Sequence, residues 1–429
     1  MKRSALNKLI AWKESKRRKP LIINGARQVG KTWLMQKFGD DYYSKVAYVS
    51  FYNNERAKRI FDNDYDMKRI ILSLQLETQI KITPNDTLII LDEIQECPKA
   101  LESLKYFCED ASEYHVMAAG SLLGVALHSG ISYPVGKVNL LDLYPLSYKE
   151  FLEAIGEEQL ALALDSKDYS IIDTFADKYL FNLKNYLYVG GMPDVVNCFV
   201  EEHDYNVVRE LQSDIIRMYR DDFGKHIPDS DFLKVCLVWD SVAVQLAKEN
   251  KKFFFGNIKK GARSSDFENA IEWLVNAGLV HKVSRVNEPH VPLAAYKDIS
   301  AYKLFFLDVG LLGAMSELDP VSIIEGNQIF IEFKGALAEQ YVLQELKAET
   351  NYTPYYFSTQ SSRFEQDFMI QKENKVVPIE VKAATNIKSP SLKAFYDKFH
   401  PEKSIRISAL PYIDQGWMCN LPLYAVCNI

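Results

Sequence analysis

Eight residues near the start of the chain have the spacing G-x-x-x-x-G-K-T, which is typical of a phosphate-binding loop. They are Gly25, Ala26, Arg27, Gln28, Val29, Gly30, Lys31 and Thr32, with Trp33 directly after them. Glycines let such a backbone curl so that its N–H groups point at phosphate oxygens. Lys31 can reach the β- and γ-phosphates and act in catalysis, and Thr32 can ligate Mg²⁺. We expect residues 25–33 to bind ATP.

The residues on either side of this loop favour the same interpretation. Residues 20–24 are a short apolar run that predicts a buried parallel strand, and residues 31–38 fit a helix. Strand, loop and helix in that order are the context in which the loop binds phosphate. The alternative is a glycine-rich turn that arises by chance.

A second motif places two acids at the end of a predicted strand. Residues 87–91 are largely apolar, and Asp92 and Glu93 follow them. Ligands of α/β sheets bind at the carboxyl ends of the strands, so we expect Asp92 to hold Mg²⁺ and Glu93 to polarise the attacking water. A further strand is predicted at residues 115–121, and Ser121 at its end is our candidate sensor of the γ-phosphate. The alternatives are solvated acids at a strand end and a simple Gly-Ser turn.

Bulk composition limits the class of protein. The chain has 429 residues, 48% of them hydrophobic and 25% charged, which is typical of a globular protein with several domains. A net charge of −6 argues against a protein that coats nucleic acid over its whole surface. The six cysteines are scattered without a C-x-x-C pair, so we expect reduced thiols and a cytoplasmic location. The N-terminal pattern predicts no signal peptide, and no long apolar run predicts a membrane span.

Element patterns divide the chain into four predicted domains. Residues 1–156 alternate strands and helices, which predicts an α/β domain with a parallel sheet. Residues 157–225 are helical and are interrupted by Gly-Gly-Met-Pro at 190–193. Residues 226–320 and residues 321–429 form the third and fourth predicted domains.

The third domain has the pattern of a winged helix-turn-helix. Helices are predicted at residues 232–248 and 264–277, with strands at 279–286 and 301–307. A basic cluster lies between the helices, formed by Lys251, Lys252, Lys259, Lys260 and Arg263. In a protein that reads DNA the second helix would enter the major groove, so DNA or RNA is one predicted partner. A protein partner is the equal alternative, because winged helices also serve as protein-interaction modules.

The last hundred residues contain a second set of side chains that could bind a metal ion and take part in catalysis. Glu339 lies on a predicted helix, Asp367 on a strand, and Glu380 and Lys382 on the following strand. Residues two apart on a strand share a face, so Glu380 and Lys382 can converge with Asp367. Such acids can bind Mg²⁺, and the lysine can help to activate water for phosphodiester cleavage. The alternative is a surface ion pair without chemistry.

Several of these motifs together resemble the AAA-like, STAND-related P-loop ATPases of bacteria and archaea. The resemblance rests on residues 24–32, 91–95, 119–121, 144–151, 190–193, 307–312 and 379–382, and it covers essentially the whole chain. It implies ATP binding, a winged-helix middle and a C-terminal fold similar to PD-(D/E)xK restriction endonucleases. The family usually has Gly-Arg before the last ATPase strand, whereas this chain has Gly136 and Lys137. A lysine cannot make a bidentate fork with phosphate, so the departure argues against a finger role.

The sequence is compatible with three alternative functions. The first is an ATP-hydrolysing switch whose C-terminal module acts on nucleic acid with live nuclease residues. The second is an ATP-dependent regulator whose C-terminal fold is a protein-docking scaffold. The third, a small-molecule kinase, is less favoured because Asp92 beside Glu93 suits water activation.

Overall fold

The computed structural model describes residues 1–121, 134–246, 252–258, 260–319, 334–359, 365–383 and 388–429. The chain forms two compact units. The N-terminal unit is Lys2–Tyr144 together with Asn276–Gly278, and the C-terminal unit holds the remaining residues. Among the described residues, no helix combines the length and the apolar character that crossing a bilayer requires.

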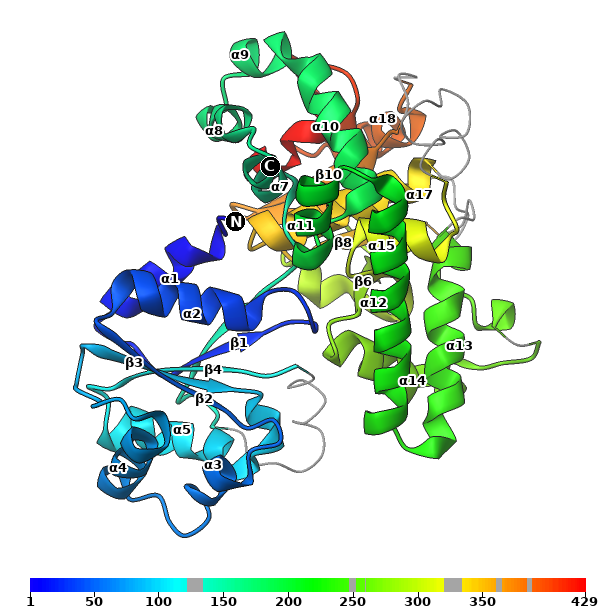
Figure 1. Ribbon diagram of the computed structural model, residues 1–429. Helices are drawn as coiled ribbons and strands as arrows, with labels where there is room; N and C mark the ends of the chain where they lie inside the picture. Colours follow the sequence, from blue (N-terminus) through cyan, green and yellow to red (C-terminus); the bar gives the residue numbers. More distant parts are fainter. Residues whose placement is uncertain (122–133, 247–251, 259, 320–333, 360–364, 384–387) are drawn as a thin grey trace. The chain divides into compact units, whose positions relative to one another are not determined.

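The N-terminal unit is an α/β domain whose sheet is parallel throughout (Figure 1). Its elements in chain order are α1 (Ala5–Glu14), β1 (Leu21–Asn24), α2 (Lys31–Tyr42), β2 (Lys45–Ser50), α3 (Glu55–Arg59), α4 (Met67–Thr78), β3 (Thr87–Asp92), η1 (Ile94–Glu96), α5 (Pro98–Asp110), β4 (His115–Ala119) and β5 (Asn139–Asp142). Helices α1 and α2 lie on one face of the sheet and α3, α4 and α5 on the other. This confirms the α/β prediction for the N-terminal part.

Strand order explains why distant motifs meet. The order is β2-β3-β4-β1-β5, so β4 lies between the strand that precedes the loop and the strand that carries Asp92. Asp92 faces Ala119 in one ladder, and Ile23 faces Ala119 in the other. Because parallel strands end at the same edge, the segments after β1, β3 and β4 gather there.

Both faces of this sheet are covered, and the sequence shows why. All six residues of β3 are buried, as expected for a parallel strand between two helix layers. Helix α4 buries Met67, Ile70, Ile71 and Leu74, which recur at the spacing of one helix face. These side chains join one apolar core with residues of β2, β3 and α5. The core holds the strand ends in place.

The C-terminal unit combines a helical part with a mixed sheet. Its helices are α7 (Tyr148–Ala154), α8 (Glu158–Ser166), α9 (Tyr169–Thr174), α10 (Ala176–Val189), α11 (Pro193–Glu202), α12 (Tyr205–His226), α13 (Asp229–Leu246), η3 (Phe255–Asn257), α14 (Ser264–Asn276), η4 (Leu293–Tyr296), α15 (Val309–Met315), α17 (Lys334–Glu349), α18 (Pro390–Phe399) and η6 (Leu423–Asn428). Its strands are β6 (Val280–Val286), β7 (Lys297–Phe306), β8 (Tyr355–Ser358), β9 (Glu365–Lys372), β10 (Lys375–Val381), β11 (Ile405–Ser408), β12 (Ile413–Asp414) and β13 (Cys419–Pro422).

The eight strands form one sheet in the order β12-β13-β11-β10-β9-β8-β6-β7. The hairpin of β6 and β7, predicted as a wing, continues this sheet because β6 pairs in parallel with β8. The predicted boundaries at residues 225 and 320 therefore lie inside one compact unit. The boundary at 156 lies near Pro145, where the C-terminal unit begins. The predicted helices at 232–248 and 264–277 correspond to α13 and α14.

Two motifs of the C-terminal unit prove to be structural. Ser147 and Glu150 form a capping box at the start of α7. The backbone N–H of Gly191 donates a hydrogen bond of 2.6 Å to Asp308, which also accepts from the N–H of Leu311 at 3.0 Å. The Gly-Gly-Met-Pro and Leu-Asp-Val-Gly motifs thus pack on each other. Neither contributes to the predicted sites.

Candidate functional site

The loop between β1 and α2 has the backbone geometry that its glycines predict. Gly30 has a φ of 91°, in the left-handed region, and Gly25 lies so close to β5 that a Cβ there would be 2.3 Å from the carbonyl oxygen of Leu143. A side chain at either position would therefore strain the loop. Ala26 and Val29 are buried, whereas the indole of Trp33 in the first turn of α2 is 41% exposed.

Lys31 lies inside the curve of this loop. Its Nζ donates hydrogen bonds to the carbonyl oxygens of Gly25 at 2.9 Å and Ala26 at 2.7 Å. Burial lowers the pKa of Lys31 to about 8, although the nearby carboxylates of Glu93 and Asp92 act in the opposite direction. The ammonium is therefore held by weak acceptors in a partly desolvated site, where phosphate oxygens would be stronger partners.

Asp92 joins the loop to strand β3. The hydroxyl of Thr32 donates to Oδ2 of Asp92 at 2.7 Å, and the hydroxyl of Tyr48 donates to the same oxygen at 2.9 Å. Oδ1 accepts the backbone N–H of Glu93 at 3.0 Å. Thr32 and Asp92 were predicted independently as metal ligands, and their oxygens lie side by side. Hydroxyl and carboxylate oxygens are the ligand type that Mg²⁺ takes.

Sequence analysis missed Tyr48. It lies on β2 beside β3, near the edge at which Asp92 ends its strand. Burial, followed by the charge of Asp92, raises the pKa of Tyr48 to about 12, so it remains a donor at neutral pH. The sequence feature that could have indicated its role was a tyrosine near the carboxyl end of the strand next to β3.

Glu93 is held by two side chains. Its Oε2 accepts a hydrogen bond of 2.5 Å from Nε2 of Gln95 and one of 3.0 Å from the hydroxyl of Ser121. The Ser121 oxygen in turn accepts from Nε of Arg27 at 3.0 Å. The structure thus connects the loop, the predicted water-polarising acid and the predicted sensor in one chain of hydrogen bonds. The role of Gln95 was not predicted. The sequence feature that could have indicated it was the position of Gln95 two residues after Glu93.

The predicted residues of the C-terminal unit also come together. Phe368 faces Ile379 in the antiparallel ladder, so Asp367 and Glu380 are neighbours on adjacent strands. Oδ2 of Asp367 accepts the N–H of Val381 at 2.8 Å. Lys382 forms an ion pair of 2.8 Å with Oε1 of Glu380. Burial on its own would lower the pKa of Lys382, but Glu380, Asp367 and Glu339 together raise it.

The cluster differs from the prediction in two ways. Lys303 of β7, which sequence analysis missed, lies 3.8 Å from Oε2 of Glu339 and 2.8 Å from Oε1 of Glu365. In addition, no set of three or more His, Cys, Asp or Glu side chains suited to a metal occurs in the part of the chain that the structure describes. The assignment of Glu339, Asp367 and Glu380 as metal ligands stays a prediction.

The predicted nucleic-acid surface is only partly described. Lys251 and Lys259 of the basic cluster lie outside the described residues. Nζ of Lys252 lies 5.9 Å from the ring centre of Phe254. On α12, Arg209 is directed into the protein and donates to the carbonyl oxygen of Leu318 at 2.9 Å. Lys137, which follows Gly136, forms an ion pair of 2.7 Å with Glu109.

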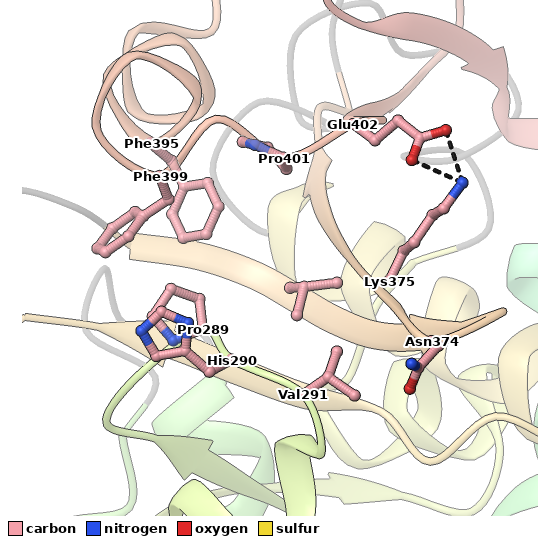
Figure 2. A pocket seen from close by; sticks show the side chains of 10 residues that line it. Pro289, His290, Val291, Asn374, Lys375, Phe395, Phe399, Pro401 and Glu402 are labelled. Atoms are coloured by element: carbon pink, nitrogen blue, oxygen red, sulfur yellow. Dashed lines mark hydrogen bonds and ion pairs between the residues drawn. The ribbon is translucent and has the colours of Figure 1, made fainter.

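A shallow pocket of about 250 Å³ occurs in the C-terminal unit (Figure 2). The rings of Phe395 and Phe399 from α18 line one side, and Lys375 forms an ion pair of 2.6 Å with Glu402 on the other. None of the predicted site residues lines this pocket.

Comparison with protein families gives three matches along the chain. Residues 17–152 match the family described as AAA domain. Residues 180–322 match the domain of unknown function DUF8612, and residues 334–415 match the domain of unknown function DUF4143. No curated protein sequence matches the chain.

Solved structures similar to this chain include the Walker-type ATPase Paby2304 of Pyrococcus abyssi. It shares 13% identity and a TM-score of 0.47, over 72% of this chain and 94% of that one. The Orc1 protein of Aeropyrum pernix in complex with DNA shares 14% identity and a TM-score of 0.29, over 75% of this chain and 94% of that one. Because these scores are low, the assignment rests on the AAA match and the site geometry. The N-terminal unit is a P-loop ATPase-type domain of an α/β fold.

Proposed function

We propose that the protein is a Mg²⁺-dependent, ATP-hydrolysing switch whose C-terminal unit acts on nucleic acid. The observation that carries the ATPase part is the 2.7 Å hydrogen bond between Thr32 and Asp92, with Glu93 next in the chain. It brings the end of the phosphate-binding loop to the acids at the end of β3. A nucleotide phosphate, its cation and an attacking water need these groups side by side.

The residues of the site suit both the nucleotide phosphates and Mg²⁺. Gly25, packed against the carbonyl oxygen of Leu143, and Gly30, with a φ of 91°, allow the tight backbone curvature that suits a loop binding phosphate oxygens. Thr32 and Asp92 offer the oxygen donors that would hold Mg²⁺. When bound, the ion would neutralise charge on the β- and γ-phosphates.

Each remaining residue has a role in hydrolysis. Lys31 would exchange the carbonyl oxygens of Gly25 and Ala26 for phosphate oxygens. Glu93 would orient the attacking water and accept its proton, while Ser121 and Gln95 hold the carboxylate in position. Arg27 connects Ser121 to the loop, so that γ-phosphate contacts can reach Glu93.

A steady-state ATPase assay with a binding measurement tests this proposal. Glu93→Gln should lower kcat at least 100-fold and leave ATP affinity within a factor of about three, because the amide keeps its shape but is no base. Lys31→Ala should weaken binding itself, monitored by the fluorescence of the exposed Trp33. Lys37→Ala on the surface of α2, where Lys37 pairs with Asp41, is the matched control. Wild-type turnover in Glu93→Gln would reject the assignment.

The nucleic-acid part of the proposal is supported by the meeting of Asp367 on β9, Glu380 on β10 and Lys382 directly after β10. Oε2 of Glu380 is buried and has no hydrogen-bond partner among the described residues, so it is open to a cation. Asp367 and Glu380 would hold the metal, and Lys382 would stabilise the charged transition state. Glu339 would add a ligand from α17.

A plasmid-nicking assay separates this proposal from the docking-scaffold alternative. Metal-dependent nicking of a supercoiled plasmid should occur in the wild type and vanish in Asp367→Ala and in Lys382→Ala. No nicking with any nucleotide would favour the scaffold.

For the helix-turn-helix pattern, binding of duplex DNA should fall steeply with salt, because lysine and arginine contacts release counterions. Reversing the charges of Lys260 and Arg263 should weaken binding for all sequences. Absence of binding at low salt would favour a protein partner.

A further inference from the structure

Lys303 is a fully buried lysine in the middle of the C-terminal acidic cluster. Its side chain is 1% exposed and starts from β7, the edge strand of the sheet. Nζ forms an ion pair of 2.8 Å with Oε1 of Glu365 and lies 3.8 Å from Oε2 of Glu339. The ring centre of Tyr356 on β8 lies 5.0 Å from Nζ. A buried ammonium persists only where opposite charges compensate its lost hydration.

The surrounding acids keep this lysine charged. Burial on its own would lower the pKa of Lys303, but Glu339, Glu365 and Asp367 together raise it above its usual value. The acids of the cluster thus have a cation of the protein itself among them. Two of them, Glu339 and Asp367, are among the three residues predicted to bind metal, the third being Glu380.

We propose that the ammonium of Lys303 is a built-in competitor of the divalent cation, which keeps the C-terminal site poor in metal while Lys303 remains inserted. The inference rests on the proposed metal-dependent role of this cluster and adds its regulation. The ammonium of Lys303 pairs with the carboxylates of Glu339 and Glu365. In a buried site of low dielectric, its charge also repels a divalent cation at short range.

The remaining oxygens define where the competition takes place. Oε1 of Glu380 pairs with Lys382, and Oδ2 of Asp367 accepts the N–H of Val381, whereas Oε2 of Glu380 has no hydrogen-bond partner among the described residues. A divalent cation bound by Asp367 would be within electrostatic reach of the ammonium of Lys303, because Asp367 is one of the charges that act on that ammonium. Withdrawal of Lys303 would both release Glu339 and remove the repulsion.

Mn²⁺ titration followed by electron paramagnetic resonance tests the inference. All variants are made in the full-length chain carrying Asp92→Asn, without nucleotide, so that the ATPase site contributes little binding. Lys303→Met keeps the length of the side chain without its charge and should bind Mn²⁺ at least tenfold more tightly than the parent. Lys303→Arg should bind as weakly as the parent.

Lys282→Met is the matched control. Lys282 on β6 also pairs with a glutamate, Glu272 at 2.6 Å, and also lies over a tyrosine ring, at 4.7 Å from the centre of Tyr302. Its loss should leave Mn²⁺ affinity unchanged. Addition of Asp367→Asn to Lys303→Met should remove the gain, which locates the new binding at this cluster.

Folding is checked by thermal unfolding of the same proteins. Lys303→Met leaves carboxylates without their counter-ion, so its melting temperature should fall without metal and rise again with Mn²⁺, whereas that of the parent should not change. Equal Mn²⁺ affinity in the parent and in Lys303→Met would overturn the inference. If that shared affinity is tight and depends on Asp367, the metal-dependent proposal survives; if neither protein binds, both proposals fail.

Discussion

The hydroxyl of Ser121 donates a hydrogen bond of 3.0 Å to the carboxylate of Glu93. Ser121 lies two residues beyond the last residue of β4, and Glu93 directly follows β3, so neighbouring parallel strands bring the pair together. Because Ser121 also accepts from Arg27 of the loop, it connects the residues proposed to bind phosphate with the acid proposed to orient water.

Ser121→Ala should therefore affect turnover more than binding. Loss of one hydrogen bond to a charged group is worth about 1.5–3 kcal/mol, which corresponds to a decrease in kcat of roughly 10- to 100-fold. The affinity for ATP should change by less than a factor of about three, because Ser121 touches the carboxylate and not the loop backbone. Separate measurement of kcat and of ATP binding by Trp33 fluorescence checks this. An increase in KM with unchanged kcat would instead make Ser121 a ground-state contact.

Lys31 predicts a pH dependence of ATP affinity. Its pKa of about 8 lies below that of an exposed lysine, so above pH 8 the loop binds ATP only after Lys31 takes up a proton. Affinity should be constant below pH 8 and fall by up to about tenfold per unit above it. Dissociation constants measured between pH 7 and pH 9.5 check this. Lys31→Arg, whose charge persists over this range, should lack the decrease; equal wild-type affinities at pH 7 and pH 9.5 would contradict the prediction.

Gly190→Ala should destabilise the C-terminal unit strongly. Gly190 has a φ of 75°, and a Cβ there would lie 2.1 Å from Oδ1 of Asp308. The carboxylate cannot move away without losing its bonds to Gly191 and Leu311, so we expect a loss of about 3 kcal/mol or more. Gly156→Ala is the control, because Gly156 has a similar φ of 86° but nothing within 4 Å of its Cβ position. Gly156→Ala should lower the free energy of unfolding by about 1 kcal/mol. Equal decreases for the two variants in urea unfolding would refute the steric argument.

Glu345 predicts a pH dependence of stability. It is buried in α17, and burial, with Glu349 nearby, raises its pKa well above 4.5. A raised pKa means that the native state binds the proton more tightly, so this contribution is complete at acidic pH and is lost as pH rises through the raised pKa. Glu345→Gln can still accept the N–H of Tyr148 and should raise stability relative to the wild type more at pH 8 than at pH 5. Chemical unfolding at both values, with the exposed Glu202→Gln as control, checks this; equal differences at both pH values would reject it.

Most of the N-terminal site could be predicted from the sequence because its information is local. The loop spacing, the apolar run before it and the two acids after β3 each lie within one strand and its next turn. Parallel strands deliver such turns to one edge of the sheet, so placing each motif at a strand end was enough to bring them together. Tyr48 and Gln95 were missed because their positions, near the end of a neighbouring strand and two residues after Glu93, do not by themselves specify hydrogen bonds to Asp92 and Glu93.

For the C-terminal unit, sequence reasoning reached the elements but not their assembly. Strands β9 and β10 are joined by a tight turn, so the meeting of Asp367, Glu380 and Lys382 follows from local pairing. The hairpin of β6 and β7 also followed from its pattern, but its parallel pairing with β8 joins segments about 70 residues apart in the chain. Parallel pairing over such a separation leaves no periodic signal.

The sequence by itself determined the glycine loop after β1 and the two acids after β3, because each motif lies within one strand and the turn that follows it. Only the tertiary structure decided which charges share a buried space. Lys303 of β7 reaches Glu339 and Glu365 across the sheet, and Asp308 receives the N–H of Gly191 from 117 residues away. Burial makes such pairings energetically decisive, since a buried charge must find its partner wherever the fold places one.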